Sequence, residues 1–328
     1  MARQKVLLTN PIDPGGLKIL EAVAEVVTAP DAGAATLRKL VSEADLLVVR
    51  AFLPPDIFDQ PNRLRGVVRH GVGLDMIPME SATSHGIPVA NVPGSNAEAV
   101  AEHAIAGMLL VARRIHTMDR EIRSIDWPTA RKHADASTEL CGRTLGVVGM
   151  GNVGTRVAEI ASAGFRMRVL GTPTRSRALP GFVEAAQVDG IFAGSDFIVL
   201  ACPLTPETRH LVNAARLAHM KPGAAIVNVA RGPVSEEAAL VEALRTKRIR
   251  GAVLDVFDEQ PLRRDHPFLS LDNVILTPHA AGITEDSMKN MSRGAAEEAV
   301  RLLAFERPRN LCNPEVWERQ AERRKTWT

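Results

Sequence analysis

The amino-acid sequence predicts an α/β protein with two doubly wound parallel sheets, each in its own domain. The chain has 328 residues, about twice the ~150 residues of a usual domain, and 45% of them are apolar. Short strands rich in Val, Ile and Leu alternate with longer segments of helical period, which is typical of βαβ units. One strand also leads through a glycine-rich turn, GMGNVG at 149–154, into a helix.

The first series of expected strands is short and apolar. It occupies residues 5–8, 45–49, 66–69 and 87–89. Segments of helical period near 14–24, 32–43 and 75–84 separate these strands. Strand and helix therefore alternate from the start of the chain.

The second series begins at Arg143 and contains six apolar runs that we expect to be buried strands. They span residues 144–148, 166–170, 196–200, 224–228, 251–254 and 273–276. One long helix, from 96 to about 123, joins the two series, and a second, about 285–305, returns the C-terminus to the first domain. We expect one domain of residues 1–103 and 289–328 and another of residues 104–288.

Composition excludes several classes of protein. The 40 Lys and Arg nearly balance the 38 Asp and Glu and are interspersed with them, so we expect no nucleic-acid partner. No uncharged apolar stretch approaches the ~18 residues of a membrane helix. Cys141, Cys202 and Cys312 lack metal-ligand spacing, which predicts no metal site and a reducing, cytoplasmic location. The absence of tyrosine excludes short-chain dehydrogenases, which use a Tyr–Lys pair.

The glycine-rich turn predicts a dinucleotide site in a Rossmann-like domain. Gly149, Gly151 and Gly154 allow a tight turn and a close backbone approach to a pyrophosphate. Asn152 and Val153 open the helix, whose N-terminal N–H groups attract the phosphate charge. The alternative is a Gly-rich turn without a ligand.

The segment after the second strand of this domain favours NADP over NAD. NAD enzymes place an acidic residue there for the ribose 2′-OH, but no Asp or Glu lies between Glu159 and Glu184. Hydroxyls and cations suit a 2′-phosphate instead. The segment supplies them as Thr174, Arg175, Ser176 and Arg177. The alternative is a solvated loop with two surface arginines.

Polar side chains follow three later strands of the second series. Arg231 follows one strand, Asp255 and Gln260 follow the next, and His279 follows the last. Hydride chemistry at a carbonyl needs a cation to polarise the substrate and an acid to protonate its oxygen, and Arg231 and His279 are suitable groups. The alternatives are a surface arginine in a helix-entry turn and a histidine that caps a loop.

At these motifs the chain resembles the D-2-hydroxyacid dehydrogenase family, which includes phosphoglycerate dehydrogenases and glyoxylate and hydroxypyruvate reductases. The resemblance runs from about residue 46 to 301. Besides the glycine-rich turn, its motifs are HGVGLD (70–75), VPGSNAEAVAEH (92–103), PLTPETRHLVN (203–213), VNVARGPVSEEAAL (227–240), LDVFDEQPL (254–262) and TPHAAG (277–282).

The resemblance implies roles for the substrate-binding residues. Arg231 is the ligand of the substrate carboxylate and carbonyl, and His279 is the proton donor in reduction and the base in oxidation. Val72 and Gly73 belong to a backbone N–H cradle for the carboxylate. Arg50 lies at a neighbouring strand end and also binds substrate, although a domain-interface salt bridge would explain it equally well.

The resemblance also assigns cofactor contacts outside the glycine-rich turn. Asp255 matches the residue that bonds the nicotinamide carboxamide. Further contacts fall on Pro203, Thr208 and Ala230.

Gln260 departs from the family pattern. Family members usually carry Glu at this position, hydrogen-bonded to the catalytic histidine. Glu259 is adjacent, but neighbouring residues of an extended segment point their side chains in different directions. Formate dehydrogenases, which resemble the family, also have Gln here, so a formate dehydrogenase-like activity is an alternative.

Together these features predict a two-domain enzyme with its active site in the cleft between a substrate-binding domain and a dinucleotide-binding domain. We expect it to interconvert a small, glyoxylate- or hydroxypyruvate-like 2-keto acid and its D-2-hydroxy acid with NADPH. The resemblance implies a homodimer through the dinucleotide domains, with Trp127 and Pro128 as an arm toward the partner. The rival from another class is a dinucleotide-sensing, corepressor-like binding protein.

Overall fold

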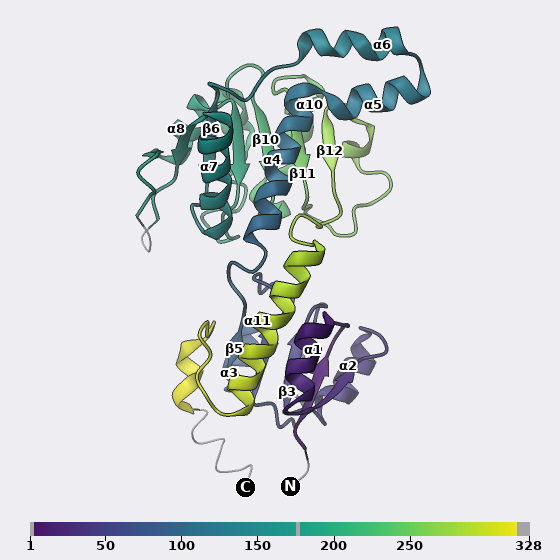
Figure 1. Ribbon diagram of the computed structural model, residues 1–328, viewed down its shortest axis with the longest axis vertical. Coiled ribbons are helices and arrows are strands. Elements are labelled where there is room, and N and C mark those ends of the chain that lie inside the picture. Colours follow the sequence, from purple (N-terminus) through teal and green to yellow (C-terminus); the bar gives the residue numbers. More distant parts are fainter. Residues whose placement is uncertain (1–2, 175–177, 320–328) are drawn as a thin grey trace. The chain divides into compact units, whose positions relative to one another are not determined.

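A computed structural model describes residues 3–174 and 178–319. The chain forms two compact units, unit 1 (Met1–Asn96 with Thr284–Thr328) and unit 2 (Ala97–Ile283), each built on one parallel sheet (Figure 1). The predicted fold class is thereby confirmed. The predicted domain boundaries, at residues 103 and 288, fall inside helices α4 (Ala97–Arg113) and α11 (Glu285–Leu303). In the part of the chain that the structure describes, no helix is both long and apolar enough to cross a membrane.

Unit 1 contains a five-stranded parallel sheet of order β2-β1-β3-β4-β5. Its strands are β1 (Lys5–Leu8), β2 (Glu25–Thr28), β3 (Leu46–Val49), β4 (Gly66–Arg69) and β5 (Val89–Ala90). Its helices are α1 (Pro14–Glu21), α2 (Ala34–Val41), α3 (Met79–Ser84) and α11, followed by the 3₁₀ turn η4 (Pro314–Val316). The sequence prediction lacked β2, because this edge strand is half exposed and forms no buried apolar run.

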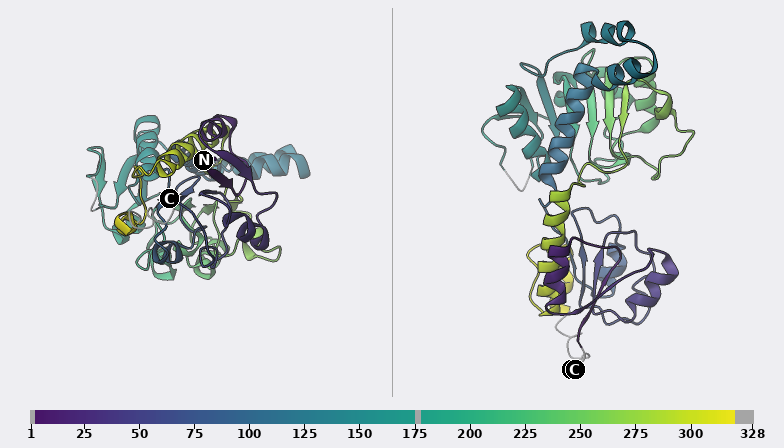
Figure 2. Two further views of the ribbon diagram at one scale, coloured as in Figure 1. Left: turned by 90° about the horizontal axis from the view of Figure 1, so that it is seen from below. Right: turned by 45° about the vertical axis from the view of Figure 1, so that its right-hand side comes forward.

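Both faces of the unit 1 sheet are buried. Leu7 and its neighbours on one face pack with α2, whereas Val6 and Leu8 on the other face pack with α1 and α11. A parallel strand covered on both sides needs apolar residues at consecutive positions, which explains the continuous apolar runs. α1 and α11 lie side by side (Figures 1 and 2). Gly16 permits this close approach, since a Cβ at that position would lie only 2.6 Å from the carbonyl oxygen of Ser292.

Unit 2 contains a seven-stranded parallel sheet of order β12-β11-β10-β9-β6-β7-β8. Its strands are β6 (Thr144–Val148), β7 (Arg168–Gly171), β8 (Val183–Ala185), β9 (Phe197–Leu200), β10 (Ala225–Asn228), β11 (Gly251–Leu254) and β12 (Val274–Leu276). The strand order reverses between β6 and β9, because β7 lies on one side of β6 and β9 on the other, and open α/β sheets bind their ligands at such a point. Two expectations need correction: the short edge strand β8 was not predicted, and β12 is only partly buried because it is the other edge.

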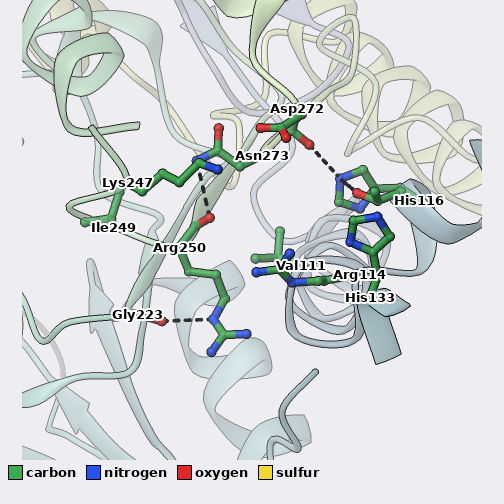
Figure 3. Close-up of a pocket in the computed structure, with 11 residues that line it drawn as sticks. Val111, Arg114, His116, His133, Gly223, Lys247, Ile249, Arg250, Asp272 and Asn273 are labelled. Carbon is green, nitrogen blue, oxygen red and sulfur yellow. Dashed lines mark hydrogen bonds between the residues drawn. The ribbon is translucent and has the colours of Figure 1, made fainter. Parts of the chain in front are cut away.

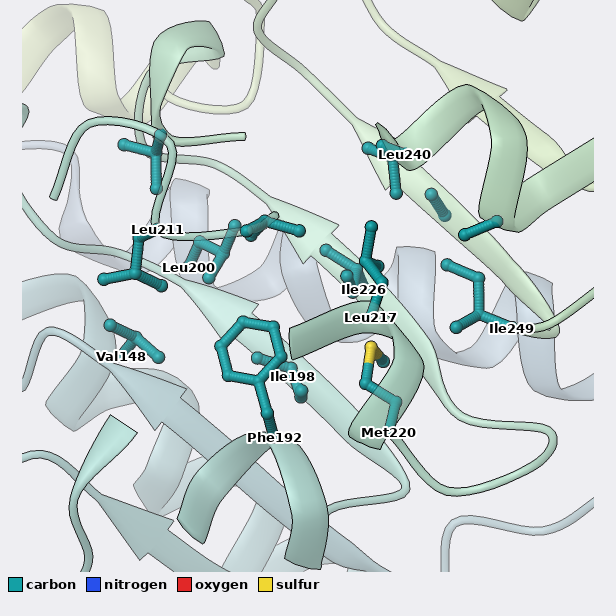
Figure 4. Packing of buried hydrophobic residues seen from close by; sticks show 14 of the residues in the cluster. Val148, Phe192, Ile198, Leu200, Leu211, Leu217, Met220, Ile226, Leu240 and Ile249 are labelled. Carbon is teal, nitrogen blue, oxygen red and sulfur yellow. The ribbon is translucent and has the colours of Figure 1, made fainter. Parts of the chain in front are cut away.

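Helices cover both faces of this sheet as well. α4 and α7 (Asn152–Phe165) pack on one face, against residues such as Val147. The other face packs against α8 (Val188–Gly194), α9 (Ala214–His219) and α10 (Glu237–Arg245). Figure 4 shows this second core, where Phe192 lies against the side chains of β9 and its neighbours. Short 3₁₀ turns complete the unit: η1 (His133–Ala136), η2 (Gly232–Val234) and η3 (Pro267–Ser270).

The predicted single helix from 96 to about 123 is wrong. α4 ends at Arg113, Arg114 adopts a left-handed backbone with φ +54°, and α5 (Ile115–Ser124) then begins in a new direction. No proline or glycine lies at the break, and the apolar period of the sequence continues across it. α5 and α6 (Trp127–Lys132) extend away from the sheet of unit 2 (Figures 1 and 2).

His70 is a buried histidine at the carboxyl end of β4. Its Nε2 lies 2.8 Å from the hydroxyl oxygen of Ser292 in α11, and that oxygen accepts a hydrogen bond from the Asp13 N–H at 2.9 Å. Burial lowers the pKa of His70 to about 4, and the charges of Arg50 and Arg69 act in the same direction. The folded protein therefore holds this ring neutral.

We predict that His70 makes the protein less stable in acid. The unfolded chain protonates this ring near pH 6.5 while the folded protein resists protonation down to about pH 4, so stability falls between these values by up to about 3 kcal/mol. Urea unfolding of wild type and His70→Asn at several pH values measures the effect. The variant should lose less stability in acid than wild type, and equal losses would contradict the prediction.

Candidate active site

Each glycine of the turn after β6 meets a different constraint. Gly149 has φ +100°, and a Cβ there would lie 2.5 Å from the backbone nitrogen of Cys202 in the loop after β9. A Cβ on Gly154 would lie 2.0 Å from the carbonyl oxygen of Gly149. At Gly151, by contrast, a Cβ would meet no atom within 4 Å. The first and last glycines of the turn therefore lie against main-chain atoms, whereas the space beside the middle glycine is open.

The open middle of the turn is the place where a pyrophosphate fits. Gly151 is the N-cap of α7, and no side chain caps the helix there. Asn152 and Val153 begin the helix, and its first turn carries no acidic residue. Helix N–H groups and the helix dipole at such an end favour a phosphate, and a glycine lets it approach the main chain. These residues fit a dinucleotide.

The loop after β7 begins without a carboxylate. The hydroxyl oxygen of Thr172 accepts a hydrogen bond from the Gly149 N–H at 3.0 Å and so ties this loop to the glycine-rich turn. Glu184 is bound elsewhere, to Arg168 at the amino end of β7, with an Nε–Oε1 distance of 2.8 Å. Thr174 follows in the loop. Arg175, Ser176 and Arg177, expected to bind a 2′-phosphate, lie outside the described residues.

The loop after β9 is ordered by Thr208. Its hydroxyl donates to the carbonyl oxygen of Pro203 at 2.7 Å and accepts from the Thr205 N–H at 2.7 Å. Pro203 and Thr208, both predicted cofactor contacts, thus hold one another in place. Cys202, which precedes them, packs against Gly149.

Asn228 holds the turn that presents Arg231. The Asn228 side chain is buried at the end of β10, where Oδ1 accepts from the Ala230 N–H at 3.0 Å and Nδ2 donates to the Arg231 carbonyl at 3.0 Å. The Arg231 guanidinium donates to the Ala230 carbonyl at 2.6 Å. Asn228 was not among the predicted functional residues, although an amide inside the apolar VNVARG motif was the available signal.

Gly232 lets the Arg231 turn lie against the loop after β11. A Cβ on Gly232 would lie 2.0 Å from the carbonyl carbon of Phe257 and 2.4 Å from the backbone nitrogen of Asp258. Only a residue without a side chain permits this approach. The contact fixes the Arg231 turn beside the segment that leads to Gln260.

Gln260 occupies the position of a histidine partner. Its Oε1 lies 2.9 Å from His279 Nδ1, and its Nε2 donates to the Phe257 carbonyl at 3.2 Å. Because the amide nitrogen is turned to a carbonyl, the oxygen faces the ring and accepts from Nδ1–H. Nε2 is then the ring nitrogen that can exchange a proton with a ligand. The neighbouring Glu259 is exposed.

Asp255 fixes the loop on both sides of His279. Its buried carboxylate accepts from the Thr277 hydroxyl at 2.6 Å, the Ala280 N–H at 2.8 Å and the Ala281 N–H at 3.0 Å. Its carbonyl also accepts from the His279 N–H at 2.8 Å. These bonds supply the partners that a buried carboxylate needs. Asp255 was predicted to contact the nicotinamide, and its positioning of the histidine was not predicted.

In unit 1, Arg69 shapes the loop that contains Val72 and Gly73. Its guanidinium donates to the carbonyls of Gly73 at 3.0 Å and His70 at 2.5 Å, and Asn91 Nδ2 donates to the Val72 carbonyl at 2.8 Å. The N–H groups of Val72 and Gly73 have no acceptor among the residues that the structure describes. The loop therefore presents donors suited to an anion. Arg69 was not predicted as a functional residue.

Arg50 follows the neighbouring strand β3 in the same unit. Its guanidinium donates to the Pro11 carbonyl and lies 3.7 Å from the sulfur of Met288. Burial lowers the pKa of this arginine. Its charge also lowers the pKa of His70, which lies two residues before Val72 in the chain.

The strand order, the glycine-rich turn and the open helix end define unit 2 as a dinucleotide-binding unit of the Rossmann type. Residues 105–281 match the NAD binding domain of the family described as D-isomer specific 2-hydroxyacid dehydrogenase. This match covers more than half of the chain, so the chain belongs to that family, whose members are oxidoreductases that use a nicotinamide dinucleotide.

Individual relatives agree with this assignment. A glyoxylate reductase of Aeropyrum pernix is 37% identical, over 96% of this chain and 98% of the relative. A D-3-phosphoglycerate dehydrogenase of Methanocaldococcus jannaschii is 38% identical over 94% of this chain, but the chain spans only 59% of its length. Among solved structures, an NADPH-dependent glyoxylate/hydroxypyruvate reductase of Sinorhizobium meliloti, in complex with NADP and malonate, superposes with a TM-score of 0.82 at 27% identity, over 95% of this chain and 98% of that one.

We predict that Gly232→Ala destabilises the protein by about 1–3 kcal/mol or more, because the added methyl overlaps the Phe257 main chain. Gly164→Ala is the matched control, since a Cβ at that position of α7 meets no atom within 4 Å. The control should change stability by no more than about 1 kcal/mol, in the stabilising direction. Urea unfolding of the two variants tests the close approach, and similar stabilities would argue against it.

Proposed function

We propose that the protein reduces a small 2-keto acid, such as glyoxylate or hydroxypyruvate, to its D-2-hydroxy acid with NADPH. The contact between His279 and Gln260, beside the rigid Arg231 turn, is the observation that carries the proposal. The contact orients a proton donor, and the Arg231 turn fixes a cation, at the carboxyl ends of the strands of a dinucleotide-binding sheet. The names of the relatives from Aeropyrum pernix and Sinorhizobium meliloti support this substrate class.

Each of four residues has a defined role in the proposed reaction. Arg231 binds the carboxylate and polarises the carbonyl, because a guanidinium is always charged and binds oxygens in pairs. When bound, the reduced nicotinamide supplies a hydride to the carbonyl carbon. His279 gives the proton on Nε2 to the carbonyl oxygen, and Gln260 holds the ring for this transfer. Asp255 keeps the His279 loop in place and is our proposed partner of the nicotinamide carboxamide.

For unit 1 we propose that Val72 and Gly73 bind the substrate carboxylate through their N–H groups. The Arg69 bonds to the loop carbonyls support this assignment, because they orient those carbonyls away from an anion. We propose that Arg50, whose charge acts on His70, also attracts the substrate carboxylate. Asn152, Val153, Pro203, Thr208 and Ala230 keep their proposed place in the dinucleotide site.

A homodimer formed through unit 2 and a cytoplasmic location remain predictions. The surface of α5 and α6 supports the dimer, because large apolar side chains are exposed along it. They are Ile115, Ile122, Ile125 and Trp127, with Ile125 62% and Trp127 68% exposed. Exposed apolar patches of this kind mark contacts between proteins.

The second candidate is a formate dehydrogenase-like activity, favoured by Gln260 beside His279. An amide neither gives nor takes the ring proton, and formate oxidation has no hydroxyl proton to remove. Formate with NAD⁺ or NADP⁺ is therefore the comparison substrate in each assay. Cofactor binding without turnover on either substrate would favour the corepressor-like alternative.

Glyoxylate reduction by NADPH, followed by the near-ultraviolet absorbance of the reduced cofactor, is the direct test. We expect Arg231→Ala to lower kcat/KM by more than about tenfold with little change in cofactor affinity. His279→Ala should lower turnover by ~10²–10⁴. Wild-type rates in either variant would remove that residue from the mechanism.

We predict that NADPH is preferred over NADH by about two orders of magnitude, because each charge-assisted contact to the 2′-phosphate contributes about 1.5–3 kcal/mol. Arg175→Ala combined with Arg177→Ala should abolish most of this preference through weaker NADPH binding. Arg168→Ala is the matched control, since Arg168 pairs with Glu184 at the opposite end of β7. Equal kcat/KM for the two cofactors in wild type would refute the NADP assignment.

Gln260→Glu should shift the pH profile of the reaction. A carboxylate beside His279 stabilises the imidazolium, so the variant keeps its proton donor to higher pH and its alkaline limb of reduction moves upward. Oxidation needs the neutral ring, so its rising limb should also move to higher pH. The profiles of kcat/KM for wild type and variant test this where chemistry limits the rate. Superimposable profiles would show that Gln260 does not influence the ring.

A further inference from the structure

A pocket lies within unit 2 at the amino ends of its strands (Figure 3). Three of its lining residues lie at the amino ends of strands. Arg250 and Asn273 come directly before β11 and β12, and Gly223 comes two residues before β10. The amino ends of parallel strands all lie along one border of the sheet, which is its amino edge. Gly149 and His279 instead follow the carboxyl ends of strands, at the opposite border. The pocket is therefore separate from the dinucleotide site. Its volume of about 220 Å³ suits a small ligand with a few waters.

Positive charge dominates the lining of this pocket. Arg114, Lys247 and Arg250 line it, and none of them forms an ion pair with a carboxylate in residues 3–174 or 178–319. Arg250 is half-buried and donates only to neutral carbonyls, those of Gly223 and Ala136, each at 3.1 Å. Burial lowers the pKa of Arg250, and the like charges of Arg114 and Arg143 lower it further. The cluster therefore lacks a counter-charge.

The remaining charged groups of the lining do not supply that counter-charge. His133 is bound to Glu121, with Nε2 and Oε2 2.7 Å apart, so that carboxylate is already used. Asp272 is exposed, and it contacts the His116 ring only through its main-chain carbonyl, 3.4 Å from Nε2. Figure 3 shows His116 and His133 together on one side of the pocket and Arg250 on the other.

Two lining residues carry buried polar atoms that lack a partner among the described residues. They are Nδ1 of His116 and Oδ1 of Asn273. The Asn273 amide orientation is fixed, because its Nδ2 donates to the carbonyls of Leu244 at 3.1 Å and Arg250 at 3.3 Å. Buried groups without partners are costly and uncommon, which makes this lining unusual.

Two of the three cations occupy strained backbone positions. Arg114 and Lys247 both have φ +54°, a left-handed conformation that favours glycine. In each case the residue present is basic and lines the pocket. Strained residues of this kind concentrate at functional sites.

We propose that this pocket binds a small oxyanion of the phosphate class. Phosphate oxygens accept from the Arg114, Lys247 and Arg250 side chains. A phosphate group carries a charge of about −1.5 to −2 at pH 7 and several acceptor oxygens, which suits three cations better than the single charge of a carboxylate. The pocket and the proposed catalytic residues lie at opposite edges of the sheet, so this inference does not depend on the proposed function.

Isothermal titration with inorganic phosphate, against sodium chloride at equal ionic strength, tests the proposal. We expect Arg250→Gln and Lys247→Gly each to weaken phosphate binding by about tenfold or more, the effect of losing one charge-assisted contact. Lys247→Gly keeps the test valid if Arg250→Gln folds poorly, because glycine suits the φ of +54°. Arg245→Gln is the control, since Arg245 pairs with Glu242 at 3.0 Å and does not line the pocket. It should bind as wild type does.

Three results would overturn the proposal. One is an unchanged phosphate affinity in both pocket variants. Another is complete loss of phosphate binding in saturating NADPH, which would place the anion at the glycine-rich turn. The third is dissociation of both variants into a smaller species, which would assign these cations to a contact between two copies of the chain. Phosphate affinity that persists in saturating NADPH and falls only in the pocket variants supports it.

Discussion

Contacts between backbone atoms hold the loops at the carboxyl edge of the unit 2 sheet together. Gly149 lies against the main chain at Cys202, Gly154 against Gly149, and Gly232 against Phe257. Because no side chain separates these segments, their spacing is set by van der Waals contact of the main chain and cannot relax by a rotamer change. Arg231 and Gln260 belong to two of these loops, and Asp255 at the start of the Gln260 loop fixes the loop that contains His279.

Most of the fold was predictable because buried parallel strands form continuous apolar runs. The edge strands β2 and β8 were missed because half-exposed residues produce no such run. The break at Arg114 was missed because the apolar period on either side of it is unbroken.

For the site, residue type and position after a strand pointed to Arg231 and His279, whereas the contact between Gln260 and His279 was implied by the family resemblance and is present in the structure. The roles of Asn228 and Arg69 escaped prediction, because their importance lies in hydrogen bonds to distant carbonyls and N–H groups.

α11 gives unit 1 a discontinuous sequence. Ala295, Ala299 and Leu302 of this helix cover the sheet face formed by Val6 and Leu8, nearly three hundred residues earlier in the chain. During synthesis on a ribosome α1 covers only part of that face until α11 has emerged, whereas all of unit 2 has already been made. The nascent N-terminal sheet therefore exposes part of its apolar surface until almost the whole chain has been made.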